Sequence, residues 1–170
     1  MKTLRTLLII AIVIFGSAAI SFGQVSATAT ATGTIVTPIG ITNAGNMNFG
    51  NVAVSTTAGT VILAPASTRT ITGGVTLPAV NGTVTAAHFA VTGTANYTYS
   101  ITLPSTATTV TSGGNTMTVT AFTSNPTPTG TLNGSGTQTV DVGATLNVGA
   151  TQAAGTYVSG TPFTVTVNYN

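Results

Sequence analysis

Few residues in this chain of 170 could carry chemistry. Charged side chains make up 2% of it, with three Lys plus Arg, one acidic residue and no Cys. The only histidine is His88, and a histidine that acts as a general base or binds a metal needs an orienting carboxylate or further ligands. Asp141 is the one carboxylate that could serve, far away in the sequence. We therefore expect a structural or surface role for His88, and no catalytic site, metal site or cofactor.

Arg69 and Asp141 are the remaining isolated charges of the central and C-terminal sequence. A buried pair between them would be costly to break by removing one partner. Lone charges more often lie exposed on turns or edges and contribute little. We expect the second arrangement. A hydrolase built on Ser or Thr would still need His88 or Asp141 as its base, so the composition disfavours an enzyme.

The N-terminal segment has the layout of a signal peptide. Two basic residues precede an apolar run over residues 7–15, and small residues follow up to Gly23. We expect cleavage after Gly23, which makes residues 1–23 a signal peptide and the mature protein an exported one. An uncleaved membrane anchor is disfavoured, because the apolar stretch is shorter than the ~20 residues that span a bilayer.

Removal of this leader changes the charge of the protein. The formal net charge of the whole sequence is +2, and both excess charges belong to the leader, so the mature chain is neutral. A neutral chain has no basic surface for nucleic acid or for anionic lipid. We expect no nucleic-acid partner and no membrane span in the mature protein. Without cysteine, its stability must come from core packing and sheet hydrogen bonds.

Alternation of apolar and polar residues with a period of two runs through the mature chain. Threonine is the commonest residue, and its β-branched side chain favours strands. Each of five alternating segments predicts a half-buried antiparallel strand. They are residues 25–35, 97–103, 117–121, 146–148 and 163–169. Turn signals rich in Gly, Asn and Pro separate such runs, and no helical periodicity persists.

These features predict an all-β fold, an antiparallel β-sandwich of about eight to ten strands. A β-solenoid is disfavoured because the turns are unevenly spaced. The expected core is Phe49, Leu63, Ile71, Leu77, Phe89, Val91, Tyr99, Ile101, Leu103, Met117, Val119, Val140, Leu146, Val148, Tyr157, Phe163, Val165 and Val167.

The first alternating segment differs from the others. Its inward side chains are mostly methyl groups, so it gains little by folding alone and should depend on a partner. We expect residues 24–36 to form an N-terminal extended strand and residues 37–170 to form the sandwich domain. Whether the strand pairs within its own domain or with a neighbour stays open. Its inward residues are Val25, Ala27, Ala29, Ala31 and Ile35.

Several short sequence segments, taken in their order and spacing, resemble those of a known family. They are residues 47–52, 88–93, 97–104, 117–119, 142–148, 155–157 and 163–169. Over residues 25–170 the chain resembles the bacterial family called domain of unknown function 4402. That family is similar in pattern to spore coat U and archaic chaperone–usher pilin domains. The resemblance implies an exported immunoglobulin-like sandwich, a surface fibre subunit and no enzymatic activity.

The resemblance to pilins also implies partners. Pilin subunits are completed by an extended N-terminal strand from the next subunit, a form of strand addition. Residues 25–35 have the alternation for this donor role. The C-terminal strand, with Phe163, Val165, Val167 and Tyr169, resembles the strand by which periplasmic chaperones hold pilins. Candidate partners are therefore further copies of the chain, a periplasmic chaperone and an outer-membrane usher.

Together these observations predict a secreted, non-enzymatic structural protein of a pilus-like fibre or matrix at the cell surface. The protein would pass through the periplasm during export. A near-zero net charge removes electrostatic repulsion between subunits. It also removes one of the features that keep exposed sheet edges from pairing with one another. The alternative is a monomeric exported carbohydrate-binding or adhesion module. In that case Tyr97 or Tyr157 would stack on a sugar of a surface glycan, although alternating strand residues also fit a core.

Overall fold

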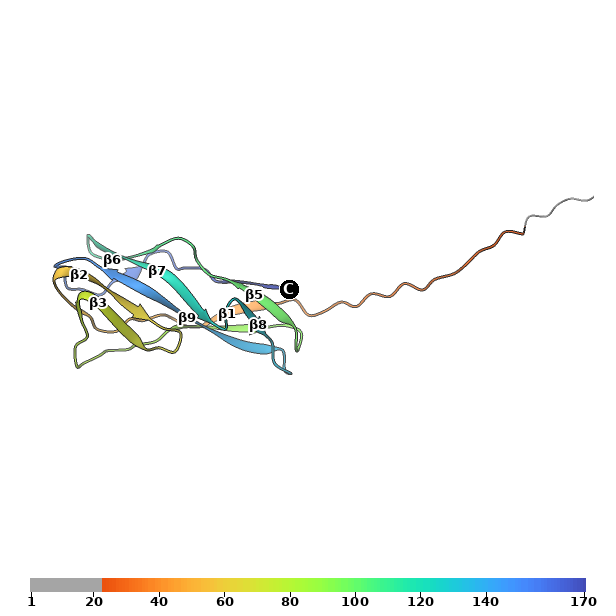
Figure 1. Cartoon of the computed structure of the whole chain (residues 1–170), viewed down its shortest axis with the longest axis horizontal. Coiled ribbons are helices and arrows are strands. Elements are labelled where there is room, and N and C mark those ends of the chain that lie inside the picture. Colours follow the sequence, from red (N-terminus) through yellow and green to blue (C-terminus); the bar gives the residue numbers. More distant parts are fainter. Residues whose placement is uncertain (1–22) are drawn as a thin grey trace, which may run out of the picture. The chain divides into compact units, whose positions relative to one another are not determined.

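The computed structural model describes residues 23–170, so the expected signal peptide, except Gly23, lies outside the described residues. The chain divides into two units, Met1–Thr34 and Ile35–Asn170. Residues 23–34 contain neither helix nor strand, and their side chains are exposed. The second unit holds every described strand (Figure 1). Within the described residues, no helix has the length and apolar character to cross a membrane.

The unit Ile35–Asn170 is built from strands alone, which confirms the all-β prediction. Its strands are β1 (Gly40–Gly45), β2 (Ala53–Leu63), β3 (Arg69–Thr76), β4 (Ala87–Thr92), β5 (Thr98–Thr102), β6 (Thr108–Ser112), β7 (Asn115–Asn125), β8 (Thr129–Thr131), β9 (Thr137–Val148), β10 (Val158–Ser159) and β11 (Thr166–Tyr169). The very short β8 and β10, of 3 and 2 residues, account for the excess over eight to ten strands.

Strand β9 is the centre of the larger sheet, whose order is β1-β4-β9-β7-β6-β10. One edge of β9 pairs with β7. Its other edge pairs first with β4, over residues 137–142, and then with β2, over residues 144–148. Strand β3 pairs with β2 alone. All these pairs are antiparallel, and the 12 residues of β9 allow it to serve both β4 and β2.

The smaller sheet has the order β11-β5-β8 and packs on the larger one. One buried cluster joins them: Phe89 and Val140 of the larger sheet share it with Tyr99 and Val167 of the smaller. Two antiparallel sheets with a common core form the predicted β-sandwich. A second cluster under β2, β7 and β9 is covered by Met47, Phe49, Val52 and Val54 from the segment around the start of β2.

Most of the expected core is confirmed. The buried members are Leu63, Phe89, Val91, Tyr99, Val119, Val140, Leu146, Val148, Val165 and Val167, and the half-buried ones are Phe49, Leu77, Ile101, Leu103, Met117, Tyr157 and Phe163. Ile71 is the wrong member, because its side chain is exposed. It lies opposite the buried Val61, but on β3, an edge strand with no neighbour beyond it.

Two predicted strands differ in the structure. Residues 25–35 form no strand and their side chains are exposed, so the expectation of a half-buried strand is wrong for the chain alone. Alanine methyl groups bury too little area to hold a strand that has no partner. Within 163–169, the strand begins only at Thr166, because the preceding residues connect β10 in the larger sheet to β11 in the smaller.

Candidate functional site

His88 and Asp141 face each other across β4 and β9. Their side chains lie 2.6 Å apart, from Nδ1 to Oδ1, and both are partly exposed. Sequence reasoning named Asp141 as the only carboxylate available to His88 and expected a structural or surface role for this histidine. Among residues 23–170 this is the only hydrogen bond of the His88 ring, and no group of three His, Cys, Asp or Glu gathers that could hold a metal. The pair joins β4 to β9 at the surface of the larger sheet.

Arg69 does not pair with Asp141. Its Nη1 donates to the backbone oxygens of Phe49, at 2.6 Å, and Asn51, at 2.9 Å. Its Nη2 donates to Oδ1 of Asn81 at 3.1 Å. The guanidinium thus ties the start of β3 to two loops. The expected isolated, exposed charge is therefore wrong for Arg69, which holds backbone in place.

The C-terminal strand β11 has one open edge. The N–H of Asn170 donates to the backbone oxygen of Thr98 on β5. Backbone groups of an antiparallel strand point alternately to its two sides. The N–H and C=O groups of Val167 and Tyr169 therefore point away from β5, and no described strand pairs with them. The side chains of Val165 and Val167 are nevertheless buried.

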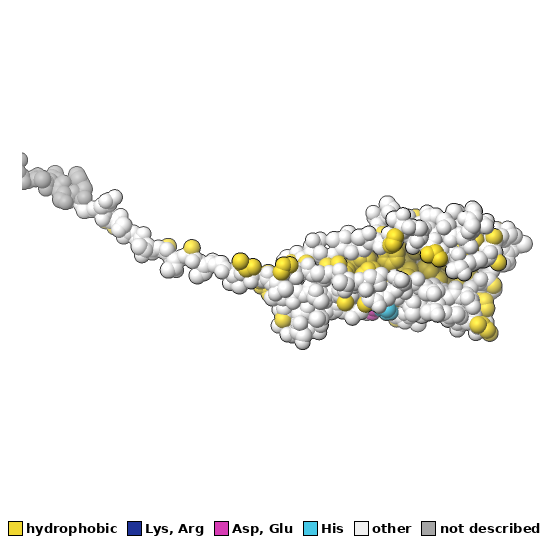
Figure 2. Space-filling model, turned by 180° about the vertical axis from the view of Figure 1, so that it is seen from behind, with side chains coloured by type: hydrophobic (Ala, Val, Ile, Leu, Met, Phe, Trp, Pro, Cys, Tyr) yellow, Lys and Arg dark blue, Asp and Glu magenta, His cyan; other side chains and the backbone are white. Residues whose placement is uncertain are grey.

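Strand β1 lies opposite the unpaired edge of β11. It pairs with β4 only, and its Cα atoms approach those of β11 to within 8 Å. Hydrophobic side chains beside both strands are half-buried and pack against the core: Ile39 and Ile41 near β1, and Phe163 and Tyr169 near β11. Figure 2 shows a band of hydrophobic surface along the strand-bearing unit, between two polar layers. We call the space between the facing edges of β1 and β11 the open seam.

Tyr169 closes one end of the open seam. Its hydroxyl donates to the backbone oxygen of Thr37 at 2.8 Å and accepts from the N–H of Thr94 at 2.7 Å. The Tyr97 ring packs edge-on against it, with centroids 5.6 Å apart. Sequence reasoning singled out Tyr169 but missed its contact with Thr37, for which the sequence carries no signal.

The expected donor residues lie together on the exposed segment that precedes the strands. Val25 is 96% exposed and Ile35 is 99% exposed. The three alanines between them are exposed as well. Apolar side chains that are exposed singly are common on protein surfaces, so this exposure by itself identifies no partner. Within the described chain, residues 25–35 pair with no strand.

The two tyrosines considered for sugar stacking lie in different surroundings. Tyr157 is half-buried, and its hydroxyl donates to the backbone oxygen of Ala153 and accepts from Gln152. Tyr97 is 44% exposed, with its ring against Tyr169. Tyr97 keeps a free surface, whereas Tyr157 serves the local fold.

The fold and the open seam define a two-sheet antiparallel β-sandwich with an unpaired C-terminal edge strand. Residues 39–169 match the family model described as Domain of unknown function (DUF4402). The match covers most of the chain, and the chain belongs to this family, which confirms the resemblance drawn from its sequence. No curated protein and no solved structure matches the chain. The wider similarity to spore coat U and pilin domains stays a prediction.

Proposed function

We propose that this protein is a non-enzymatic structural subunit of a fibre or matrix at the cell surface. In this assembly, residues 25–35 of one copy add as a strand to the open seam of the next copy. The partners are further copies of the same chain. During export, a periplasmic chaperone and an outer-membrane usher would hold and deliver the subunit.

The observation that carries this proposal is the unpaired edge of β11. Unpaired strand edges with a hydrophobic face are templates for a further strand. An added strand would bond the outward backbone groups of Val167 and Tyr169, which have no strand partner in residues 23–170. Its inward side chains would cover the half-buried Ile39 and Ile41. Strand addition uses both contributions, backbone bonds for affinity and side chains for specificity.

The size of the donor side chains suits a narrow space. A strand that pairs with both margins needs them about 9–10 Å apart, twice the usual strand spacing. At their closest, Cα atoms of β1 and β11 are within 8 Å, so the margins must separate locally. Side chains of the donor project to the two faces of the sheet, where alanine at positions 27, 29 and 31 needs little room and loses no side-chain entropy on burial. The larger Val25 and Ile35 bracket the alanines.

The direction of the donor strand decides whether the assembly grows. The sandwich begins at Ile35, and Thr37 is held by Tyr169 at one end of β11. A donor antiparallel to β11 ends beside Phe163, at the opposite end, so its own sandwich lies beyond that end. Each copy then receives a strand at one end and donates one from the other. Such a head-to-tail contact repeats without closing and forms a linear fibre.

The electrostatics of the sandwich favour close association. In residues 23–170, Arg69 and Asp141 are the only fully charged side chains, and they balance. Neither lies on the open seam. Near-neutral subunits do not repel one another, and the association should be insensitive to salt.

The test is deletion of residues 24–36 followed by electron microscopy of the purified protein. The deleted form should stay monomeric, and a synthetic peptide of residues 24–36 should bind it. Ala29→Asp in that peptide should abolish binding, because it places a charge on the inward face. Thr30→Asp, on the outward face, is the matched control and should bind. Fibres from the deleted protein, or equal effects of both changes, would overturn the proposal.

A further inference from the structure

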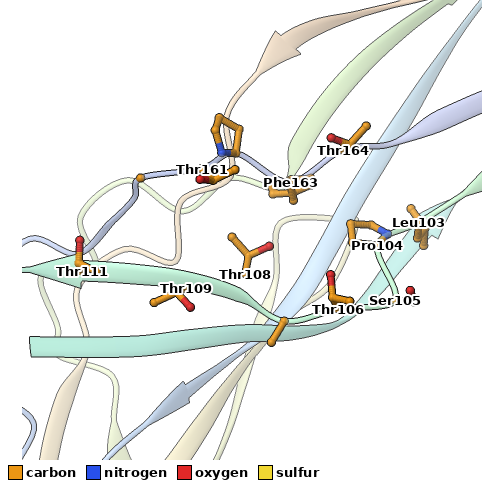
Figure 3. A pocket seen from close by; sticks show the side chains of 13 residues that line it. Leu103, Pro104, Ser105, Thr106, Thr108, Thr109, Thr111, Thr161, Phe163 and Thr164 are labelled. Atoms are coloured by element: carbon orange, nitrogen blue, oxygen red, sulfur yellow. The ribbon is translucent and has the colours of Figure 1, made fainter.

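A second feature lies where the two sheets are linked, apart from the donor segment. The connection from β5 to β6 and the connection from β10 to β11 stand on either side of a cavity of about 660 Å³. Figure 3 shows Thr106 and Thr108 on one side of this space and Thr161 and Phe163 on the other. Small-molecule sites usually measure about 300–1,000 Å³, so the cavity has the size of a ligand site.

Hydroxyl groups dominate the cavity wall. Ser105, Thr106, Thr108, Thr109, Thr161 and Thr164 all line it. The hydroxyls of Thr106, Thr108 and Thr161 make no hydrogen bond to another group of residues 23–170. Thr109 directly follows Thr108 on β6, so its side chain points to the other face of the sheet. Each free hydroxyl can donate one hydrogen bond and accept two. The wall therefore offers donors and acceptors that the fold does not use.

Backbone groups add to this supply. Sheet pairing stops at Thr102 opposite Thr166 and resumes at Thr108 and Ser159. Between these points, residues 103–107 and 160–165 form no ladder with each other or with another described strand. Their peptide groups are thus open to solvent or to a ligand on the cavity side.

An apolar surface completes the wall. Pro104, Pro162 and Phe163 line the cavity together with the hydroxyls. Phe163 is held against Phe122, with centroids 4.9 Å apart, and against Phe89, with centroids 6.3 Å apart. A fixed aromatic ring beside polar groups suits a ligand with one apolar and one polar face. No charged side chain of residues 23–170 lines the cavity.

We propose that this cavity binds a neutral oligosaccharide, with sugar hydroxyls on the threonines and an apolar ring face on Phe163 and the prolines. A sugar ring carries many hydroxyls and one C–H face, which matches the wall in both respects. The absence of charge along the wall selects against acidic sugars. This site differs from Tyr97 and Tyr157, which do not line it. It would give a surface assembly its adhesive contact, and it does not depend on strand addition.

The test is isothermal titration of the purified full chain with cellotetraose, maltotetraose, mannotetraose and laminaritetraose, with tetragalacturonate as the charged probe. At least one neutral tetrasaccharide should bind, and tetragalacturonate should not. Thr108→Val and Thr161→Val keep the shape of the side chain and remove one hydroxyl each. Each should weaken binding about two- to tenfold, the effect of one net hydrogen bond.

Thr139→Val is the matched control, since Thr139 is exposed on β9 and does not line the cavity. The affinity of the Thr139→Val variant for the neutral tetrasaccharide should equal that of the unaltered protein. The proposal is overturned if no neutral tetrasaccharide binds at millimolar concentration, or if Thr139→Val weakens binding as much as Thr108→Val. Because the donor segment is untouched, fibre formation by the same variants reports separately on strand addition.

Discussion

The hydroxyl of Tyr169 donates a hydrogen bond to the backbone oxygen of Thr37 over 2.8 Å, and so joins the last strand to the residues that precede the first. The same hydroxyl accepts from the N–H of Thr94. Three segments therefore meet at one side chain, at the end of the seam where the exposed segment leaves the sandwich. This contact fixes one margin of the open seam to the other.

Tyr169→Phe should loosen this end of the seam. It removes two hydrogen bonds and leaves the ring packing intact, so the free energy of unfolding should fall by about 1–3 kcal/mol. Urea unfolding followed by circular dichroism measures the change. Tyr97→Phe is the control, because no hydrogen bond of its hydroxyl is present within residues 23–170, and it should shift stability by less than about 0.5 kcal/mol. Equal losses in both variants would contradict the role of the Tyr169 hydroxyl.

Gly93→Ala tests the same contact from the opposite side. A Cβ atom at position 93 would collide with the Tyr169 hydroxyl and crowd Leu132. Overpacking of this kind costs about 1–3 kcal/mol. Gly134→Ala is the matched change, since its Cβ would meet nothing within 4 Å. Thermal unfolding should show a lower midpoint for Gly93→Ala only, and a normal midpoint would mean that Tyr169 can move away freely.

Arg69→Lys should destabilise the protein although it keeps the charge. Lysine lacks the planar fork by which Arg69 reaches two backbone oxygens and Asn81 at once. We expect a loss of about 1–3 kcal/mol, as for hydrogen bonds from charged groups. Hydrogen exchange of the amides around Phe49 and Asn51 should rise with it. Unchanged exchange in Arg69→Lys would show that charge, rather than geometry, holds these loops.

The stability of the protein should fall in alkali through Tyr99. Burial raises the pKa of Tyr99 above its ordinary value of 10.0. The folded state thus keeps the phenolic proton at a pH where the unfolded chain loses it. This contribution is complete below pH 10.0 and is lost as the pH rises through the pKa of the folded state.

Urea unfolding at several values of pH measures this loss. Tyr99→Phe should be less stable near neutrality, because it loses the 2.7 Å bond to Gln138, and should show a flatter decline above pH 10.0. A decline of the same slope in Tyr99→Phe would place its cause elsewhere.

The strands and much of the core follow from local pattern. Side-chain direction alternates along any strand, so the runs around Tyr99, Val119 and Val167 already indicate which residues face inward. The errors occur where burial depends on the neighbouring strand. Ile71 alternates correctly, yet it is exposed because β3 lies at the edge of its sheet. Residues 25–35 alternate as well, yet no described strand pairs with them.

The candidate site was predictable only in part. The sequence singled out the C-terminal residues from Phe163 to Tyr169 and the alternating segment 25–35. It carried no sign that Arg69 would hold backbone oxygens or that unpaired hydroxyls from two connections would gather around a cavity. Those contacts join positions far apart in the chain, and strand register brings them together.

Composition and period-two alternation alone indicate a cysteine-free, all-β protein that is neutral over residues 23–170, because charge and side-chain direction are local properties of the chain. Which edge stays unpaired is not local. It depends on β11 pairing with β5 on one side while the other side meets only the margin of β1. The open seam exists because the backbone groups of Val167 and Tyr169 point to a side on which no described strand pairs with β11.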